Sequence, residues 1–257
     1  MTNSLYALSG FCVGVLVGLT GVGGGSLMTP LLVLLFGIHP TTAVGTDLLF
    51  AASTKTLGTL LHGLSRNIDW RLVGLLALGS VPSTALTLLL LSHLDLGGGA
   101  ARQVITAALG VALLLTATFL LLARRMRAAY ADRVSRLDGR VVTVLTVALG
   151  ATMGILVTTT SVGAGAIGVT VLLLLYPRLE LGRIVGSDIA HAVPLTLVAG
   201  VGHWYLGSVD WGLLAPLLTG SLPGIAVGSA LVGRIPDVAV RTALALVLVV
   251  VGVRMML

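Results

Sequence analysis

Ten hydrophobic segments joined by short loops constrain this chain more than any other feature of its sequence. They cover residues 5–20, 26–37, 43–63, 71–91 and 102–122, and then residues 141–160, 164–176, 184–205, 211–232 and 238–256. A helix needs about 20 apolar residues to cross a bilayer, and only helices or closed barrels satisfy their backbone hydrogen bonds in lipid. Because the segments lack the alternation of barrel strands, the sequence predicts an all-α integral membrane protein.

The composition supports this class and excludes several others. Charged residues make up only 9% of the chain and the mean hydropathy is +1.10, whereas a soluble domain carries about 25% charged residues. The net charge of +6 does not indicate a nucleic-acid partner, because the basic residues lie in short loops between apolar segments. The single cysteine excludes an intrachain disulfide framework and a multi-cysteine metal site.

The chain contains the same set of motifs twice. GVLVGLTGVGGG at 14–25 aligns with GILVTTTSVGAG at 154–165, VGTD at 44–47 with VGSD at 185–188, and IDW at 68–70 with VDW at 209–211. Shared hydrophobicity does not reproduce Asp and Trp at a near-constant separation, so the sequence predicts a duplication. We expect a first transmembrane repeat at 1–122, an arginine-rich linker at 123–140 and a second repeat at 141–257.

The loop charges predict that the two repeats are inverted in the membrane. The linker contains six arginines, which the positive-inside rule places in the cytoplasm. With five segments in each half, Arg66, Arg71, Arg178, Arg183, Arg234 and Arg241 share that side, and Arg102 and Arg254 lie opposite. We therefore expect a multi-pass protein of the cytoplasmic membrane with two inverted-topology repeats and both termini extracytoplasmic.

A glycine-rich interruption precedes the second segment of each half. The segments at 26–37 and 164–176 are too short to cross comfortably, so they either span under strain or re-enter from one side and meet near the midplane. Glycine permits a sharp turn and close approach to peptide N–H groups, and the following helix N-termini favour an anion. The alternative is that these glycines only allow close helix packing. The residues predicted to bind the substrate here are Gly21, Gly23, Gly24, Gly25, Ser26, Thr160, Ser161, Gly163, Ala164 and Gly165.

Ionisable side chains within a hydrophobic segment are expensive and commonly functional, and four of those in this sequence are candidates for the site. Asp47 and Asp188 occupy matched positions and are expected either to cap their own helices in the first turn or to couple transport to protons or cations. Lys55 is a candidate counter-charge to an anion, or else forms a structural ion pair with Asp47 or snorkels to the interface. His191 is either a proton-binding group or a packed side chain.

Two further pairs are expected to be structural. His62 and His203 fall at segment ends, beside the membrane interface, where a polar structural role is expected. Trp70 and Trp211 begin the following segments, as in the aromatic belts of membrane proteins.

The motifs resemble those of a known family. GVGGGSLMTPLL near the N-terminus, AVGTDLL about twenty residues later and the degenerate second copy SVGAG are similar to the TauE/SafE family of exporters of sulfite and related organosulfur anions. The resemblance implies export of a small sulfur oxyanion. Ala164 departs from the pattern because it replaces the middle glycine of the second copy, so the two half-sites need not contribute equally.

The leading functional hypothesis is therefore a secondary transporter that exports a small anion, such as sulfite or an organosulfonate, by alternating access. A transporter of a metal cation or a carboxylate, and an anion channel, are the alternatives. An enzyme is not expected, because the sequence has no HExxH motif. We expect no cofactor and no nucleic-acid partner, and a homodimer is compatible with the apolar helix faces.

Overall fold

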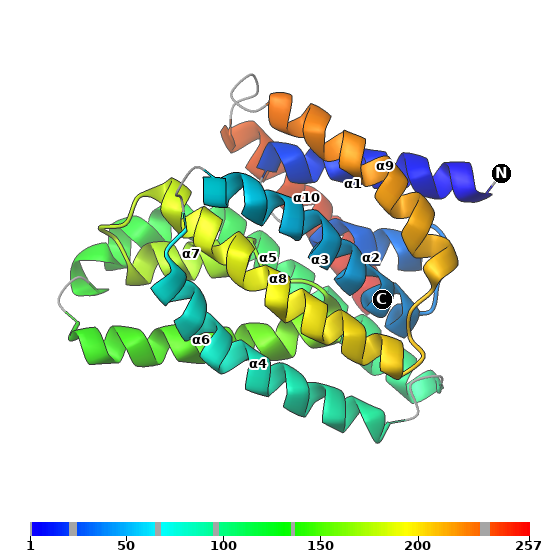
Figure 1. The fold of residues 1–257 in the computed structure, drawn as a ribbon, viewed down its shortest axis with the longest axis horizontal. Helices are drawn as coiled ribbons and strands as arrows, with labels where there is room; N and C mark the ends of the chain where they lie inside the picture. The colour runs from blue at the N-terminus through cyan, green and yellow to red at the C-terminus, as the bar shows by residue number, and fades with distance from the viewer. Residues whose placement is uncertain (1, 21–24, 65–67, 95–97, 135–136, 232–236) are drawn as a thin grey trace.

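The computed structural model describes residues 2–20, 25–64, 68–94, 98–134, 137–231 and 237–257, which fold entirely into helices and connecting turns (Figure 1). The elements are α1 (Thr2–Thr20), α2 (Gly25–Leu34), α3 (Pro40–Leu64), α4 (Trp70–Ser92), α5 (Gly99–Val134), α6 (Gly139–Thr160), α7 (Ala166–Leu175), α8 (Leu181–Tyr205), α9 (Trp211–Ala230) and α10 (Asp237–Met256). No strand occurs in these ranges, so the all-helical prediction is confirmed for the part of the chain that the structure describes.

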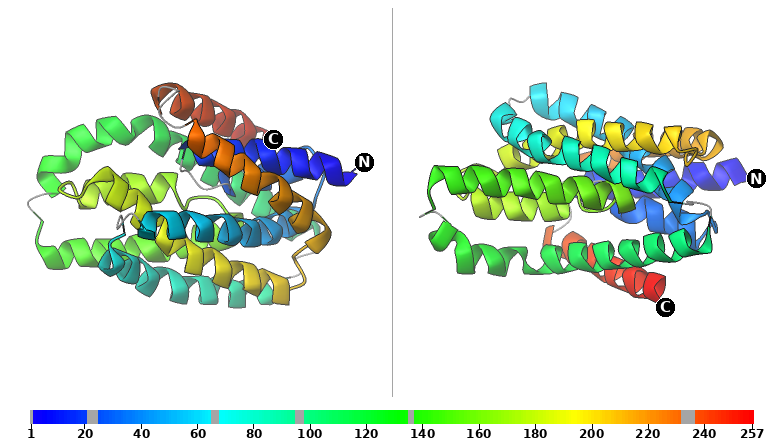
Figure 2. Two further views of the ribbon diagram at one scale, coloured as in Figure 1. Left: turned by 45° about the horizontal axis from the view of Figure 1, so that its top comes forward. Right: turned by 90° about the horizontal axis from the view of Figure 1, so that it is seen from below.

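Most helices run along the long axis of the molecule, and both termini lie at the same end in all three ribbon views (Figures 1 and 2). The opposite end carries the ends of α3 and α5 and the starts of α4, α6 and α8. Arg71, Arg140 and Arg183 therefore belong to one end of the bundle, and Arg102 and Arg254 belong to the end with the termini.

Five helices in the described ranges are long and apolar enough to cross a membrane. They are Trp70–Ser92, Arg102–Ala123, Gly139–Thr160, Leu181–Tyr205 and Trp211–Gly228. The two short helices have 10 residues each. At about 1.5 Å per residue each is about 15 Å long, half of the roughly 30 Å hydrocarbon core, so neither crosses a bilayer alone.

The basic linker is more regular than a loop. Helix α5 continues through residues 123–134 before the chain enters α6 at Gly139. The long helix thus extends beyond its apolar part, which ends at Ala123, and carries several arginines of the linker on helical backbone.

The helices pack in pairs that correspond when the two halves of the chain are exchanged. Helix α1 packs on α9, and the helices that match these two in the other half, α6 and α4, also pack on each other. Helix α3 packs on its match α8, and α5 packs on its match α10. The colours in Figure 1 show that α3 and α8 run in opposite directions. Close packing between α2 and α7 is not found in the described residues; α2 packs on α3 and α7 packs on α5 and α8. The short helices therefore do not pack closely on each other in the described residues, and the meeting of the two interruptions near the midplane stays a prediction.

Two hydrogen bonds between the halves correspond in the same way. The Asp69 backbone N–H donates to Ser187 Oγ at 2.8 Å, and the Asp210 N–H donates to Thr46 Oγ1 at 3.0 Å. Each aspartate also caps the helix that follows it, since Asp69 accepts from the N–H groups of Arg71 and Leu72, and Asp210 from those of Gly212 and Leu213. Helices α4 and α9 consequently begin at the two tryptophans of the IDW and VDW motifs, and both indoles are exposed.

Glycines bring the paired helices into backbone contact. A Cβ atom at Gly79 of α4 would overlap the backbone carbonyl of Val147 in α6, and one at Gly150 would overlap the carbonyl of Leu76. Gly10 and Gly220 play the same part between α1 and α9. The packing explanation for glycine is therefore correct at these helix crossings, as expected of small residues in membrane helices.

We expect Gly79→Ala to destabilise the protein, because the added methyl group has no space against α6. Overpacking of this kind costs about 1–3 kcal/mol. The measurement is the thermal unfolding midpoint of the purified protein in detergent. Gly74→Ala is the matched control, since it lies on the same helix with nothing within 4 Å of the added Cβ. Equal midpoints for the two variants would contradict the packing argument.

Candidate functional site

The second glycine-rich interruption is a left-handed break between α6 and α7. Helix α6 ends at Thr160, and Ser161 caps it with φ 56° and an N–H bond to Val157 O. Gly163 and Gly165 have φ values of 116° and 124°, a region that side-chain-bearing residues rarely adopt. The Thr160 hydroxyl accepts a hydrogen bond from the Val162 N–H at 3.1 Å. The break from Ser161 to Ala164 is buried, so its backbone donors lie inside the bundle.

The first interruption is described only from its second half. Gly21, Gly23 and Gly24 lie outside the described residues. Gly25 begins α2, and Ser26, in its first turn, is buried.

Asp47 lies well inside α3, bonded to the short helix α2. The Thr29 hydroxyl of α2 donates to Asp47 Oδ2. The Ser161 hydroxyl, at the break in the other half of the chain, lies beside the same carboxylate without the geometry of a hydrogen bond. Asp47 thus links α3, α2 and the α6–α7 break.

Asp188 occupies the matched position on α8 with different surroundings. Its Oδ1 lies against Gly168, in the first turn of α7, where a Cβ atom would collide with the carboxylate. The side chain is 2% exposed, and Oδ1 has no hydrogen-bond partner. A glycine at position 168 therefore makes the space that this carboxylate occupies.

Neither aspartate caps its own helix, so that sequence-based expectation was wrong. Helix α3 begins at Pro40 and α8 at Leu181, and neither has an acidic residue in its first turn. Both helices begin about one turn before the point where their apolar character starts, which moves Asp47 and Asp188 away from the helix ends.

Lys55 lies inside the bundle on α3, two turns after Asp47. It is 8% exposed, so it does not snorkel to the surface. It interacts electrostatically with Asp47 and Asp188 and with His191. In the described residues the ion pair within 4.0 Å is Arg183–Asp69 at 3.7 Å, so the direct Lys55–Asp47 pair weighed from the sequence is not formed.

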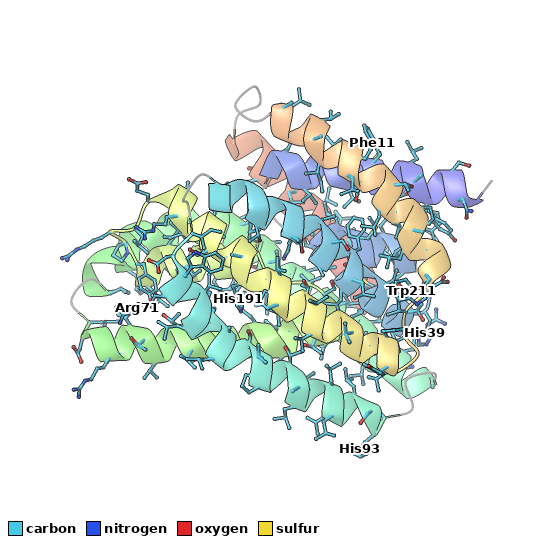
Figure 3. All side chains as sticks on the ribbon, viewed as in Figure 1. Phe11, His39, Arg71, His93, His191 and Trp211 are labelled. Atoms are coloured by element: carbon cyan, nitrogen blue, oxygen red, sulfur yellow. The ribbon has the colours of Figure 1, made fainter. Side chains whose placement is uncertain are left out.

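The buried histidines are held by neighbouring helices. His191, one turn after Asp188, pairs through Nε2 with Ser80 Oγ of α4 at 2.8 Å, and its Nδ1 has no partner. Figure 3 places His191 within the bundle, between the end marked by Arg71 and the end marked by His39, His93 and Trp211.

His203 pairs through Nε2 with the Thr158 carbonyl of α6 at 2.9 Å. It is buried at 1% exposure in the last turn of α8, and its structural role beside the membrane interface stays a prediction. The side chain of His62 is outside the described set.

Sequence reasoning missed three residues that shape this site, namely Thr29, Ser80 and Gly168. Two of them carried a usable signal, because Thr29 recurs as Thr170 and Ser80 recurs as Ser221 in the GSVP and GSLP motifs. Gly168 had no such signal, since its importance follows only from the approach of Asp188.

We expect Thr29→Val to destabilise the protein, because it leaves the Asp47 carboxylate buried without its hydroxyl donor. Loss of a hydrogen bond to a buried polar group costs about 1–3 kcal/mol. Thermal unfolding in detergent measures the effect. Thr152→Val is the matched control, since Thr152 is exposed and bonds only to Ala148 O of its own helix. A Thr29 variant as stable as this control would show that the bond contributes little.

The buried charged side chains of the site limit what it can bind. Three charged side chains are buried in the described residues, namely Asp47, Lys55 and Asp188. No group of three or more His, Cys, Asp or Glu side chains placed to hold a metal ion occurs there. Buried ionisable groups inside a bundle of membrane-length helices mark the path of a solute or proton, which is the organisation of a membrane transporter.

Comparison with known proteins identifies the family. The model described as sulfite exporter TauE/SafE matches residues 6–255, and the chain belongs to this family of membrane transporters. It is 37% identical over 252 residues to the probable membrane transporter protein YjnA of Bacillus subtilis (strain 168), which covers 96% of this chain and 97% of that relative. It is 28% identical over 231 residues to the probable membrane transporter protein YdhB of the same organism, with 88% of each chain covered. No solved structure matches the chain.

Proposed function

We propose that the protein is a secondary transporter that exports a small anion, such as sulfite or an organosulfonate, across the cytoplasmic membrane by alternating access. The observation that carries this proposal is Lys55, a buried cation near two carboxylates in the interior of the bundle. A buried ammonium group attracts an anion strongly because the low-dielectric interior screens it little.

The proposed binding residues are Lys55 and the two interruptions. At the second one, the hydroxyls of Thr160 and Ser161 and the backbone of Gly163, Ala164 and Gly165 precede the N-terminus of α7. N–H groups at a helix N-terminus and glycine backbone without side chains form a suitable site for an oxyanion. We propose the same role for Gly21, Gly23, Gly24, Gly25 and Ser26 before α2.

Alternating access is proposed from the correspondence between the halves. Two matching helix pairs join residues 1–122 to residues 141–257, namely α1–α9 and α6–α4. Two matching hydrogen bonds do the same, Asp210 to Thr46 and Asp69 to Ser187. We propose that the halves are inverted repeats, which can exchange conformations around a shared central site. The concentration of arginines at one end of the bundle supports a cytoplasmic position for that end and for the 123–140 linker.

The membrane potential is sufficient to drive export. Each charge gains about 2.3 kcal/mol per 100 mV, so a dianion leaving an inside-negative cell gains roughly 4.6 kcal/mol. At about 1.4 kcal/mol per tenfold, this supports a gradient above about a thousandfold. An ATP-hydrolysing partner is not required.

The proposal is tested by flux in proteoliposomes that contain the purified protein. Labelled sulfite or methanesulfonate is loaded inside, and a potassium diffusion potential of either sign is imposed. We expect saturable efflux of sulfite that is faster when the interior is negative, and exchange of labelled for unlabelled anion with either anion. Flux equal to that of empty liposomes with both anions would refute the anion proposal, and saturable flux without exchange would favour a channel.

A metal-cation transporter is the second candidate, because the two buried carboxylates outnumber the single buried lysine. The same vesicles distinguish the two candidates. Uptake of manganese or nickel ions that is blocked by Asp47→Asn, together with absence of anion exchange, would replace the anion proposal with this one.

A further inference from the structure

The surroundings of Asp188 differ from those of Asp47, and this difference points to a second transported species. We infer that Asp188 binds a proton together with each anion, so that the protein moves the anion and a proton in the same direction. This inference rests on the proposed anion transport and adds the coupling ion, so a dianion leaving with one proton carries one net negative charge and still gains about 2.3 kcal/mol per 100 mV.

The first argument is the balance of buried charge around Asp188. Four helices pack against α8, and of these α3 contributes the buried charged side chains Asp47 and Lys55. Helix α7 has no ionisable side chain. The charged side chains of α4 and α6 are Arg71 and Arg140, which are exposed at one end of the bundle. Helix α8 itself contributes His191 and His203, and Arg183 at its exposed start; the side chain of His62 is outside the described set. One ammonium group therefore faces two carboxylates, and Lys55 compensates only one of them.

The second argument identifies which carboxylate is compensated. Asp47 accepts the Thr29 hydroxyl at Oδ2, while its Oδ1 has no hydrogen-bond partner, so one of its two oxygens has a donor that suits a carboxylate anion. Asp188 lies against Gly168, its Oδ1 also has no partner, and no hydroxyl in the described residues donates to it as Thr29 donates to Asp47. A buried carboxylate without donors or a paired cation is unfavourable, whereas the same group as a neutral acid is tolerated. Asp188 is therefore the proton-binding member of the pair.

The third argument links the proton to the anion. An anion beside Lys55 adds negative charge to a region that already holds two carboxylates, so it binds well only when one of them is neutral. Protonation of Asp188 at Oδ1 makes this possible, and release of the proton at the other membrane face repels the anion from Lys55. His191 lies on the same face of α8 one turn later, with Nδ1 unpartnered, and provides a neighbouring group for the proton.

The proton on Asp188 is tested first without any substrate. Infrared spectra of the reconstituted protein between acid and alkaline pH are expected to show the carbonyl band of a protonated carboxylic acid. The band should be absent in Asp188→Asn and present in Asp47→Asn. A band that survives in Asp188→Asn and disappears in Asp47→Asn would overturn the assignment, whatever anion is transported.

The coupling is tested with labelled methanesulfonate, which stays a monoanion across the pH range. The membrane potential is clamped at zero with potassium and valinomycin, and the outside is made two pH units more acid than the inside. Coupling of one proton to one anion predicts accumulation of label inside up to about 100-fold, since one pH unit corresponds to a tenfold ratio. Asp188→Asn is expected to exchange the label without accumulating it, so its ratio stays near one.

The failures of the two proposals are distinguishable. Exchange in the wild type with no accumulation, or accumulation that is undiminished in Asp188→Asn, would overturn proton coupling and leave the anion transporter intact. No exchange of either methanesulfonate or sulfite in the wild type would overturn the transport proposal and this inference with it. Asp210→Asn is a control, because this carboxylate is exposed and caps α9.

Discussion

Lys55→Met is expected to reduce anion exchange at least about 100-fold. Lys55 is buried, and it is the only basic side chain within electrostatic reach of both Asp47 and Asp188 in the described residues. Methionine keeps the length of the apolar stem but removes the charge. A charge-assisted hydrogen bond contributes about 1.5–3 kcal/mol to binding, equivalent to roughly 10- to 150-fold, and removal also leaves the two carboxylates uncompensated. The measurement is the initial rate of labelled sulfite or methanesulfonate exchange in proteoliposomes.

Two companion variants make the Lys55 result interpretable. Lys55→Arg retains the charge and is expected to retain more exchange than Lys55→Met. Arg254→Met removes an exposed cation at the end with the termini and is expected to exchange normally. If Lys55→Met folds and exchanges the anion at the wild-type rate, Lys55 is not the counter-charge, and the anion site has to be sought elsewhere.

Much of the helical framework was predictable because it depends on local properties of the chain. A run of apolar residues long enough to cross the bilayer has few alternatives to a helix, and Trp70 and Trp211 begin α4 and α9 as the segment limits indicated. The break after Thr160 was predictable for a related reason, since Gly163 and Gly165 permit backbone angles that other residues avoid.

The environment of the two aspartates was not predictable in the same way. The apolar segments begin at 43 and 184, which predicts Asp47 and Asp188 near helix starts, whereas the helices begin three residues earlier, at Pro40 and Leu181. Pro40 was a signal for the earlier start, because proline is favoured in the first helical turn. The contact between Asp188 and Gly168 joins α8 to α7, and no local pattern in the sequence specifies such a contact.

The pairing of helices shows a second limit of sequence reasoning. The duplication indicated which segments correspond, but not that α1 packs on α9 and α6 on α4. Those crossings depend on glycines that face backbone carbonyls of another helix, such as Gly79 against Val147. In a chain with 34 glycines, composition alone does not separate these from the glycines of the break.

The double variant Gly163→Ala with Gly165→Ala is expected to abolish anion exchange while the protein still inserts into the membrane. Both glycines have φ values that are strained for alanine, 116° and 124°, and such conformations cost of order 1–3 kcal/mol each. A Cβ atom at Gly163 meets nothing closer than 3.8 Å, so the effect there arises from the backbone conformation. Relief of the strain would rotate the peptide groups between Ser161 and α7, and the predicted oxyanion donors would lose their arrangement.

A control for strain alone is available in the loop between α8 and α9. Gly207 also has a positive φ, 71°, with nothing within 4 Å of an added Cβ, so Gly207→Ala strains the backbone away from the proposed site. We expect this variant to lower the unfolding midpoint while leaving anion exchange near the wild-type rate, and the double variant to lower both. Normal exchange in a double variant that is strained and correctly inserted would mean that the break serves the fold and does not hold the anion. Lys55 and the first interruption would then have to account for recognition.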